Sequence, residues 1–238
     1  MQKQQIKLIF GIIGTIVAQF FYIAPVVPCI KLIKDELSYK NYPGILLVCS
    51  SLNCLLWFVY GIEKNELMVY LANGLGVAIT EIWIIIYILF VVKTVIIYSI
   101  LVNLGIVVFQ GGIFVIFHVV LNKPAITSKI AMVMNILMYA APGEKIYKVL
   151  KTNDYTILPI SSSICGVICC TCWLIYGIYL GEISMIIPNA LGDVFSVLQI
   201  IVYVVAKKRA KTRGIIKEDG ENNNENTMEE KVIDSKQD

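Results

Sequence analysis

The sequence predicts an all-α membrane protein with seven transmembrane helices, arranged as two parallel three-helix bundles joined by a linker helix. Three observations support this fold class. The chain is 58% hydrophobic and only 16% charged, whereas soluble domains carry about 25% charged residues. Its apolar runs are long enough to cross a bilayer. Two parts of the chain also repeat the same landmarks at a nearly constant spacing.

Seven apolar stretches lie between charged residues. A hydrocarbon core about 30 Å thick needs roughly 20 residues of helix. The expected spans are 8–30, 41–62, 67–92, 94–122, about 124–143, 155–181 and 183–206. The first stretch is longer than the apolar core of a cleavable signal peptide, typically about 7–15 residues. We therefore expect it to remain in the protein as the first span.

The basic residues are unevenly distributed between the two sides of these spans. With the N-terminus outside, twelve lysines and arginines fall on the inside and five on the outside. Basic residues accumulate on the cytoplasmic side of membrane proteins, so we expect an outside N-terminus and a cytoplasmic C-terminus. Residues 207–238 are expected to form a basic flank and a disordered acidic tail, because they contain little apolar material to bury.

An internal repeat organises the chain. The first copy contains Tyr22-Ile-Ala-Pro25, Pro43, Trp57-Phe-Val-Tyr60-Gly61 and Asn73-Gly-Leu-Gly76, and the second contains Tyr139-Ala-Ala-Pro142, Pro159, Trp173-Leu-Ile-Tyr176-Gly177 and Asn189-Ala-Leu-Gly192. The first landmark is offset by 117 residues and the later ones by 116. We expect repeats at 1–92 and 124–206, with a linker helix in 93–123. Because each copy has three spans, the linker makes the copies parallel, and such repeats enclose a substrate site near the membrane midplane.

These motifs together resemble the SWEET family of sugar transporters, over residues from about 8 to 206. The resemblance rests on one proline in each of spans one, two, five and six, and on the Trp-x-x-Tyr-Gly and Asn-x-x-Gly motifs of both copies. It implies facilitated, bidirectional transport of a mono- or disaccharide by alternating access, with no cofactor, and assembly as a homo-oligomer. The plasma membrane is the expected location, with an internal membrane as the alternative.

Six residues form the predicted substrate site: Asn73 and Asn189, Trp57 and Trp173, and Asn53 and Cys169. The first pair of amides can bind sugar hydroxyls or hydrogen-bond neighbouring helices. The tryptophan pair can stack on a sugar ring or belong to an interfacial belt. The third pair lies one helical turn before the tryptophans. The resemblance implies that this pair sets substrate size, and its asparagine favours a smaller sugar.

The resemblance also implies a gate at each end of the substrate path. Prolines remove a helix hydrogen bond and weaken the backbone locally. Hinges of the inner gate are predicted at Pro25, Pro43, Pro142 and Pro159. The outer gate is predicted at Tyr60, Lys64 and Glu182. A lysine–glutamate pair there would either close the mouth or form only a solvated pair worth about 0–1 kcal/mol.

Two carboxylates, Glu81 and Asp193, fall within predicted spans, where an ionisable residue is a functional candidate. We expect Glu81 in helix packing or an inner vestibule, whereas Asp193 could contact substrate, hold water or confer proton dependence. A proton-coupled transporter of another small polar solute is therefore the alternative function, and a seven-helix receptor a weaker one. His118, outside both repeats, is expected to be a packing residue.

Chemistry of other kinds has no support in the sequence. We find no nucleophile–base pair, metal-ligand spacing or phosphate-binding loop. The seven cysteines all fall in apolar stretches, where they suit helix packing. We therefore expect neither an enzyme nor a metal site, and no nucleic-acid partner. The expected partners are the sugar, the lipid bilayer and other copies of the chain.

Overall fold

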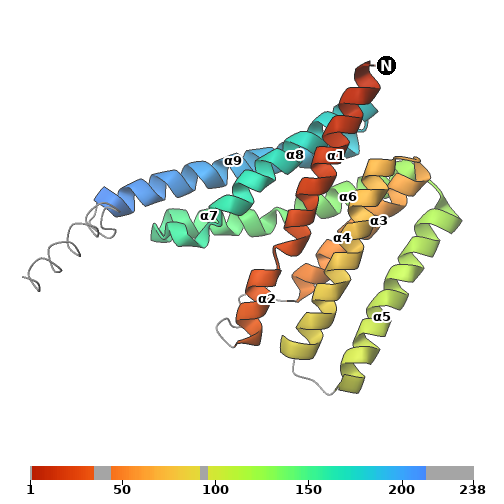
Figure 1. Ribbon diagram of the computed structural model, residues 1–238, viewed down its shortest axis with the longest axis horizontal. Coiled ribbons are helices and arrows are strands. Elements are labelled where there is room, and N and C mark those ends of the chain that lie inside the picture. Colours follow the sequence, from red (N-terminus) through yellow and green to blue (C-terminus); the bar gives the residue numbers. More distant parts are fainter. Residues whose placement is uncertain (1, 35–43, 92–95, 213–238) are drawn as a thin grey trace, which may run out of the picture.

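A computed structural model describes residues 2–34, 44–91 and 96–212, and these residues are almost entirely helical (Figure 1). The helices are α1 (Gln2–Ile23), α2 (Val26–Ile33), α3 (Ile45–Glu63), α4 (Leu67–Ile86), α5 (Ile96–Phe114), α6 (Pro124–Met138), α7 (Ala140–Thr152), α8 (Ile160–Leu180) and α9 (Ile183–Thr212). The π-helical segments Tyr87–Val91 and Val115–Leu121 continue α4 and α5, and the short 3-10 turn Tyr155–Ile157 precedes α8. Within the described residues, seven helical segments are long and apolar enough to cross a membrane. This confirms the predicted fold class.

The outer surface of the molecule is apolar, as a lipid-facing surface must be. Val108, Val120 and Ile183 keep 65%, 70% and 66% of their surface exposed. A helix that is apolar on all sides needs an apolar environment on all sides. The hydrophobic effect therefore places these helices in the bilayer. Their association with one another is stabilised by van der Waals contacts and by hydrogen bonds between helices.

Two three-helix bundles make up the molecule. The first consists of α1, α3 and α4, and the second of α6, α8 and α9. The linker helix α5 packs beside α3 and α4 of the first bundle (Figure 1). Between the bundles, α1 contacts α8 and α3 contacts α6. The repeat relates these two contacts to each other, since the first span of one copy meets the second span of the other.

The bundles are close together at one end and diverge towards the other (Figure 1). We call the first the N-terminal end, because α1 begins there, and the second the C-terminal end, because α9 ends there. At the C-terminal end, α2 contacts helices of the first repeat, whereas α7 contacts α6 and α9 of the second.

Helix breaks mark the first span of each copy. Pro25 lies between α1 and α2, and a second break at Tyr139 separates α6 from α7, with Pro142 in the first turn of α7. Pro159 immediately precedes α8. Pro43, the fourth predicted hinge, lies outside the described residues.

Several helices extend beyond the predicted spans. The first begins at Gln2 rather than residue 8, and α9 continues through the basic flank to Thr212 rather than ending at 206. The fifth span is broken at Tyr139 and continues to Thr152. Hydropathy marks the part of a helix that suits lipid, whereas backbone hydrogen bonds continue the helix into the polar interface. The acidic tail from residue 213 onwards lies outside the described residues.

Candidate functional site

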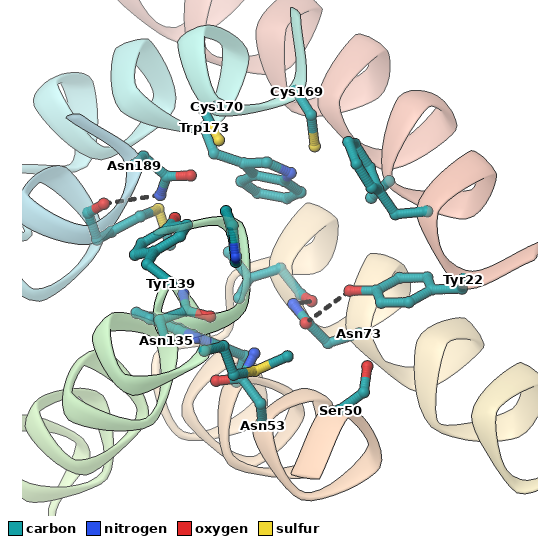
Figure 2. Close-up of a pocket in the computed structure, with 17 residues that line it drawn as sticks. Tyr22, Ser50, Asn53, Asn73, Asn135, Tyr139, Cys169, Cys170, Trp173 and Asn189 are labelled. Carbon is teal, nitrogen blue, oxygen red and sulfur yellow. Dashed lines mark hydrogen bonds between the residues drawn. The ribbon is translucent and has the colours of Figure 1, made fainter. Parts of the chain in front are cut away.

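A cavity of about 410 Å³ lies between the two bundles (Figure 2). Its lining includes all six residues of the predicted substrate site: Asn73, Asn189, Trp57, Trp173, Asn53 and Cys169. The volume falls in the lower part of the range of about 300–1,000 Å³ that is typical of small-molecule sites. The fold thus brings residues more than a hundred positions apart in the sequence to one cavity.

The paired asparagines are fixed in the same way in both repeats. The Nδ2 atom of Asn73 donates to the carbonyl oxygen of Val69 at 2.8 Å, and that of Asn189 donates to the carbonyl oxygen of Met185 at 2.7 Å. Each bond spans one turn of its own helix and uses the amide nitrogen. The side-chain carbonyl oxygens are therefore the groups left for a ligand. That of Asn73 has only a long contact of 3.5 Å with the Tyr22 hydroxyl (Figure 2).

Two further polar atoms in the lining have no partner among the described residues. They are the Oδ1 atom of Asn53 and the Nε1 atom of Trp57, one turn apart on α3, and both are buried. A buried polar group without a partner costs about 1–3 kcal/mol. One atom is an acceptor and the other a donor, and both are closed off from solvent, so a ligand reaches either only if a neighbouring side chain moves.

The lining also contains residues that the sequence analysis did not single out. Asn135 comes from α6, Tyr139 from the break between α6 and α7, Tyr22 from α1, and Cys170 stands beside Cys169 on α8 (Figure 2). The hydroxyl of Tyr139 donates to the carbonyl oxygen of Pro188 at 2.7 Å. The two tyrosines were visible as repeat landmarks. Asn135 had no such signal, because Ala18 occupies the matching position in the first copy.

The glycines of the Asn-x-x-Gly motifs make room for these tyrosines. A Cβ atom added to Gly76 would lie 2.8 Å from the Tyr22 ring, and one added to Gly192 would lie 2.5 Å from the Tyr139 hydroxyl oxygen. Real Cβ atoms essentially never approach so closely. Each motif therefore combines a cavity-lining amide with a socket for an aromatic side chain, one turn farther along the helix.

The cavity is covered towards the N-terminal end by two reciprocal bonds between the repeats. The hydroxyl of Tyr60 donates to Glu182 at 2.9 Å, and the hydroxyl of Tyr176 donates to Glu66 at 2.5 Å. Both tyrosines are almost fully buried, at 0% and 2% exposure. Hydrogen bonds to a charged acceptor are stronger than neutral ones. These two bonds therefore hold the bundles together on this side of the cavity.

Of the two alternatives for Lys64, a closing pair with Glu182 or a solvated side chain, the structure has the solvated one. Lys64 is exposed at the end of α3 and makes no ion pair within the described part of the chain. Its repeat counterpart is Leu180, whereas the counterpart of Glu182 is Glu66, again at an offset of 116. Applying the repeat offset to the predicted gate acid would have found Glu66, which the sequence analysis passed over.

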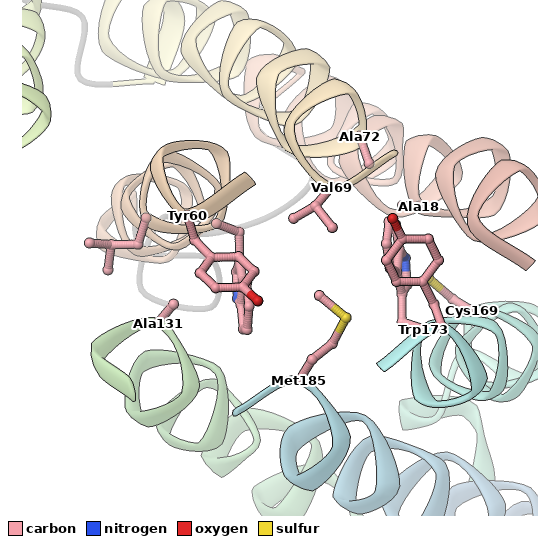
Figure 3. Close-up of a cluster of buried hydrophobic side chains, with 11 residues drawn as sticks. Ala18, Tyr60, Val69, Ala72, Ala131, Cys169, Trp173 and Met185 are labelled. Carbon is pink, nitrogen blue, oxygen red and sulfur yellow. The ribbon is translucent and has the colours of Figure 1, made fainter. Parts of the chain in front are cut away.

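A buried cluster surrounds the gate tyrosines and joins all six bundle helices (Figure 3). Trp57 lies edge-on to Tyr60, with ring centroids 5.5 Å apart, and Trp173 stands in the same relation to Tyr176 at 5.4 Å. Aromatic pairs favour such edge-to-face geometry. The Trp-x-x-Tyr-Gly motif thus links the lining of the cavity directly to its cover.

Neither intramembrane carboxylate lines the cavity. Glu81 accepts from Ser51 at 2.7 Å and from Gln110 of the linker helix at 2.6 Å. Asp193 accepts from Thr171 at 3.2 and 3.3 Å, which joins α9 to α8. Both acids therefore take part in helix–helix bonds rather than in the lining. For Glu81, of the two roles expected, helix packing or an inner vestibule, these contacts are of the packing kind.

His118 also lies away from the cavity. It belongs to the segment that continues the linker helix, and its ring packs 5.2 Å from that of Phe114. This arrangement agrees with the packing role predicted from its position outside both repeats.

Comparison with known proteins gives a match to each repeat. A family model described as "sugar efflux transporter for intercellular exchange" matches residues 8–95 and 125–211. The chain is 29% identical over 209 residues to the bidirectional sugar transporter SWEET1a of Sorghum bicolor, covering 85% of this chain and 77% of that protein. It is 27% identical over 205 residues to the bidirectional sugar transporter SWEET10 of Arabidopsis thaliana, covering 84% and 71%.

The fold also has a solved counterpart. A structure of a eukaryotic SWEET transporter at 3.7 Å resolution matches with a TM-score of 0.72 and 21% sequence identity, covering 87% of this chain and 100% of the other. The arrangement of helices described above is therefore that of a known membrane fold.

Proposed function

Because the chain belongs to the family of sugar efflux transporters for intercellular exchange, we propose that it carries mono- or disaccharides in both directions across a membrane by facilitated diffusion. The observation that carries this proposal is the cavity between the repeats, lined by matched asparagines and tryptophans. The amide oxygens accept hydrogen bonds from sugar hydroxyls, and the indole faces stack on the apolar face of the ring. The small volume favours a monosaccharide.

We propose that transport alternates access between two closures. The Tyr60–Glu182 and Tyr176–Glu66 bonds form the closed gate at the N-terminal end. Opening there separates the bundles, while the broken first spans, with Pro25 and Pro142 near the breaks, bend to close the C-terminal end. With both of these bonds formed, the structure corresponds to the state closed at the N-terminal end.

The direction in the membrane follows from charge. The basic residues of α7 and α9 lie at the C-terminal end, and basic segments prefer the cytoplasmic side. We therefore propose that the N-terminal end faces the outside. We also propose that the protein resides in the plasma membrane and that its copies associate as a homo-oligomer, as the family resemblance implies. An epitope tag at the N-terminus that antibodies reach in intact cells supports this orientation, and one reached only after permeabilisation contradicts it.

The geometry favours uniport over proton coupling. A coupling carboxylate must meet the transport path, but Asp193 and Glu81 are bonded between helices outside the cavity lining. Uptake that persists when the pH gradient is collapsed agrees with uniport. Loss of uptake under that treatment favours the coupled alternative.

The central experiment measures sugar exchange in proteoliposomes that contain the purified chain, with radiolabelled glucose and sucrose. Asn73→Ala and Asn189→Ala each remove one sugar acceptor, and the loss of about 1–1.5 kcal/mol of binding lowers exchange at low sugar concentration about 5- to 12-fold. Asn103→Ala, on the linker helix away from the cavity, is the matched control and keeps the wild-type rate. Sugar flux no higher than in empty liposomes would overturn the proposal.

A further inference from the structure

The closed gate at the N-terminal end is symmetric in its tyrosines and acids but not in its cations. Lys7 of α1 places its Nζ atom 2.9 and 3.0 Å from the two carboxylate oxygens of Glu66. The same Nζ atom lies 5.4 Å from the ring centroid of Tyr176, the residue that donates to Glu66 from the other repeat. One lysine therefore touches both partners of one gate bond.

The second gate bond has no such cation. By the 117-residue offset of the first span, the counterpart of Lys7 is Pro124, which begins α6 and carries no charge. Glu182 accepts from Tyr60 at 2.9 Å and from the backbone N–H of Ser184 at 3.3 Å. Within the described residues it forms no ion pair. The two halves of the gate therefore differ in charge: a lysine pairs with Glu66, whereas Glu182 is held, among these residues, only by neutral donors.

Lys7 is also more than a surface charge. Its side chain is 24% exposed and that of Glu66 is 15% exposed, so solvent screens this pair less than a surface pair. One turn along α1, a Cβ atom added to Gly11 would lie 2.7 Å from both Met68 and Tyr176. This tight packing of α1 against both repeats fixes the backbone from which the lysine reaches Glu66.

Opening at this end must separate Tyr176 from Glu66 and Lys7, because they belong to different repeats. The Lys7–Glu66 pair lies within the first repeat and can persist, but the cation–π contact and the tyrosine bond are both lost. A cation over an aromatic ring is attracted to the ring, more strongly where the pair is partly shielded from water. Lys7 therefore stabilises the closed state relative to the open one.

From this we propose that Lys7 is a one-sided latch, which holds the N-terminal end closed and so makes the apparent sugar affinity differ between the two faces of the transporter. Sugar at a face binds only the fraction of molecules open to that face, so its apparent affinity falls with that fraction. The latch weakens binding at the N-terminal face and strengthens it at the other. The asymmetry of sugar affinity rests on the proposed function, whereas the latch itself does not depend on what the protein transports.

The test uses cysteines that line the cavity as reporters of which face is open. Cys169 and Cys170 border the cavity, and a small membrane-impermeant methanethiosulfonate reaches them only through an open end. The reagent is added to the face that carries the N-terminus, in sealed vesicles of known orientation, and labelling is located by mass spectrometry. Lys7→Met keeps the length of the side chain but removes its charge. We expect labelling about 3- to 10-fold faster than in the wild type.

Two variants separate a latch from a general loss of structure. Lys3→Met removes an exposed charge one turn earlier on α1 and keeps the wild-type labelling rate. Lys7→Arg keeps the cation and the stacking contact, and labelling returns towards the wild-type value. Unchanged labelling in Lys7→Met, or equal acceleration in Lys3→Met, overturns the latch.

The affinities give a second readout. Lys7→Met raises apparent sugar affinity at the N-terminal face and lowers it at the C-terminal face, whereas a merely damaged protein loses affinity at both. Faster labelling in a protein that moves no sugar upholds the latch and refutes the proposed function. If the wild type exchanges sugar but Lys7→Met is labelled at the wild-type rate, the proposed function stands and the latch is refuted.

Discussion

The two repeats share one frame but attach different polar residues to it. The asparagines, tryptophans, gate tyrosines and gate glutamates recur in both and surround or cover the cavity. The Ser51–Glu81 bond of the first repeat, which Gln110 of the linker helix joins, has no counterpart among the described residues of the second repeat, and the Asp193–Thr171 bond has none among those of the first. The comparison teaches that residues found in both repeats line or cover the cavity. Residues found in one repeat only join helices to one another or shift the balance between the open and closed states.

The largest expected difference between the repeats concerns the glycines that close the Trp-x-x-Tyr-Gly motifs. A Cβ atom at Gly61 would lie 2.6 Å from the backbone nitrogen of Tyr70, which cannot yield without moving α4. At Gly177 the nearest atom is the flexible Met185 Cγ at 3.2 Å. We expect Gly61→Ala to destabilise the fold by about 1–3 kcal/mol. For Gly177→Ala, the gain in helix propensity offsets a mild clash.

Thermal unfolding of the two variants in the same detergent checks this. A midpoint that is clearly lower for Gly61→Ala but not for Gly177→Ala supports the contrast between a rigid backbone neighbour and a flexible side-chain neighbour. Equal midpoints would show that the first repeat is not packed more tightly there.

A smaller effect is expected where the linker helix joins the first repeat. Gln110→Ala removes the amide that donates to Glu81 at 2.6 Å and to Ser51 at 3.1 Å. Hydrogen bonds between membrane helices average about 0.6 kcal/mol, with a maximum near 1.7, and we expect a loss of about 1–2 kcal/mol because the acceptor is a carboxylate. Val108→Ala, on the lipid-facing side of the same helix, is the control. A midpoint for Gln110→Ala no lower than that of the control contradicts the linker bond.

The smallest effect is expected at Asp193, the carboxylate that only the second repeat carries. Asp193→Asn keeps an acceptor for Thr171 and leaves the cavity lining unchanged. We expect sugar affinity and its pH dependence to stay within about twofold of wild type, or roughly 0.4 kcal/mol. Exchange rates measured across a pH series check this, and a pH dependence abolished by the variant would reinstate the proton-coupled alternative.

The repeat explains what could be predicted from the sequence. Its offset located the asparagines and tryptophans, which the fold gathers in one cavity. The same offset, applied to Glu182, also identifies Glu66. The prediction instead pairs Glu182 with a nearby lysine. The role of Lys7 could not be predicted, because the first predicted span begins after this charged residue, at position 8. In the structure, the helix begins at Gln2 and includes Lys7. Asn135 has no counterpart in the first copy, and Gln110 lies on the linker helix outside both copies, so the repeat pointed to neither. Their contacts depend on how helices far apart in the sequence pack.

The lining of the cavity has one more consequence, which concerns electrical work. All of the described residues that border it are uncharged at neutral pH. Moving one elementary charge through a membrane potential of 100 mV involves about 2.3 kcal/mol. A neutral solute in a neutral cavity involves none, whichever end is open. For a carrier that couples its cargo to no ion, as proposed above, the voltage across the membrane then does no work on the sugar. The sugar concentrations on the two sides set the direction of net flow.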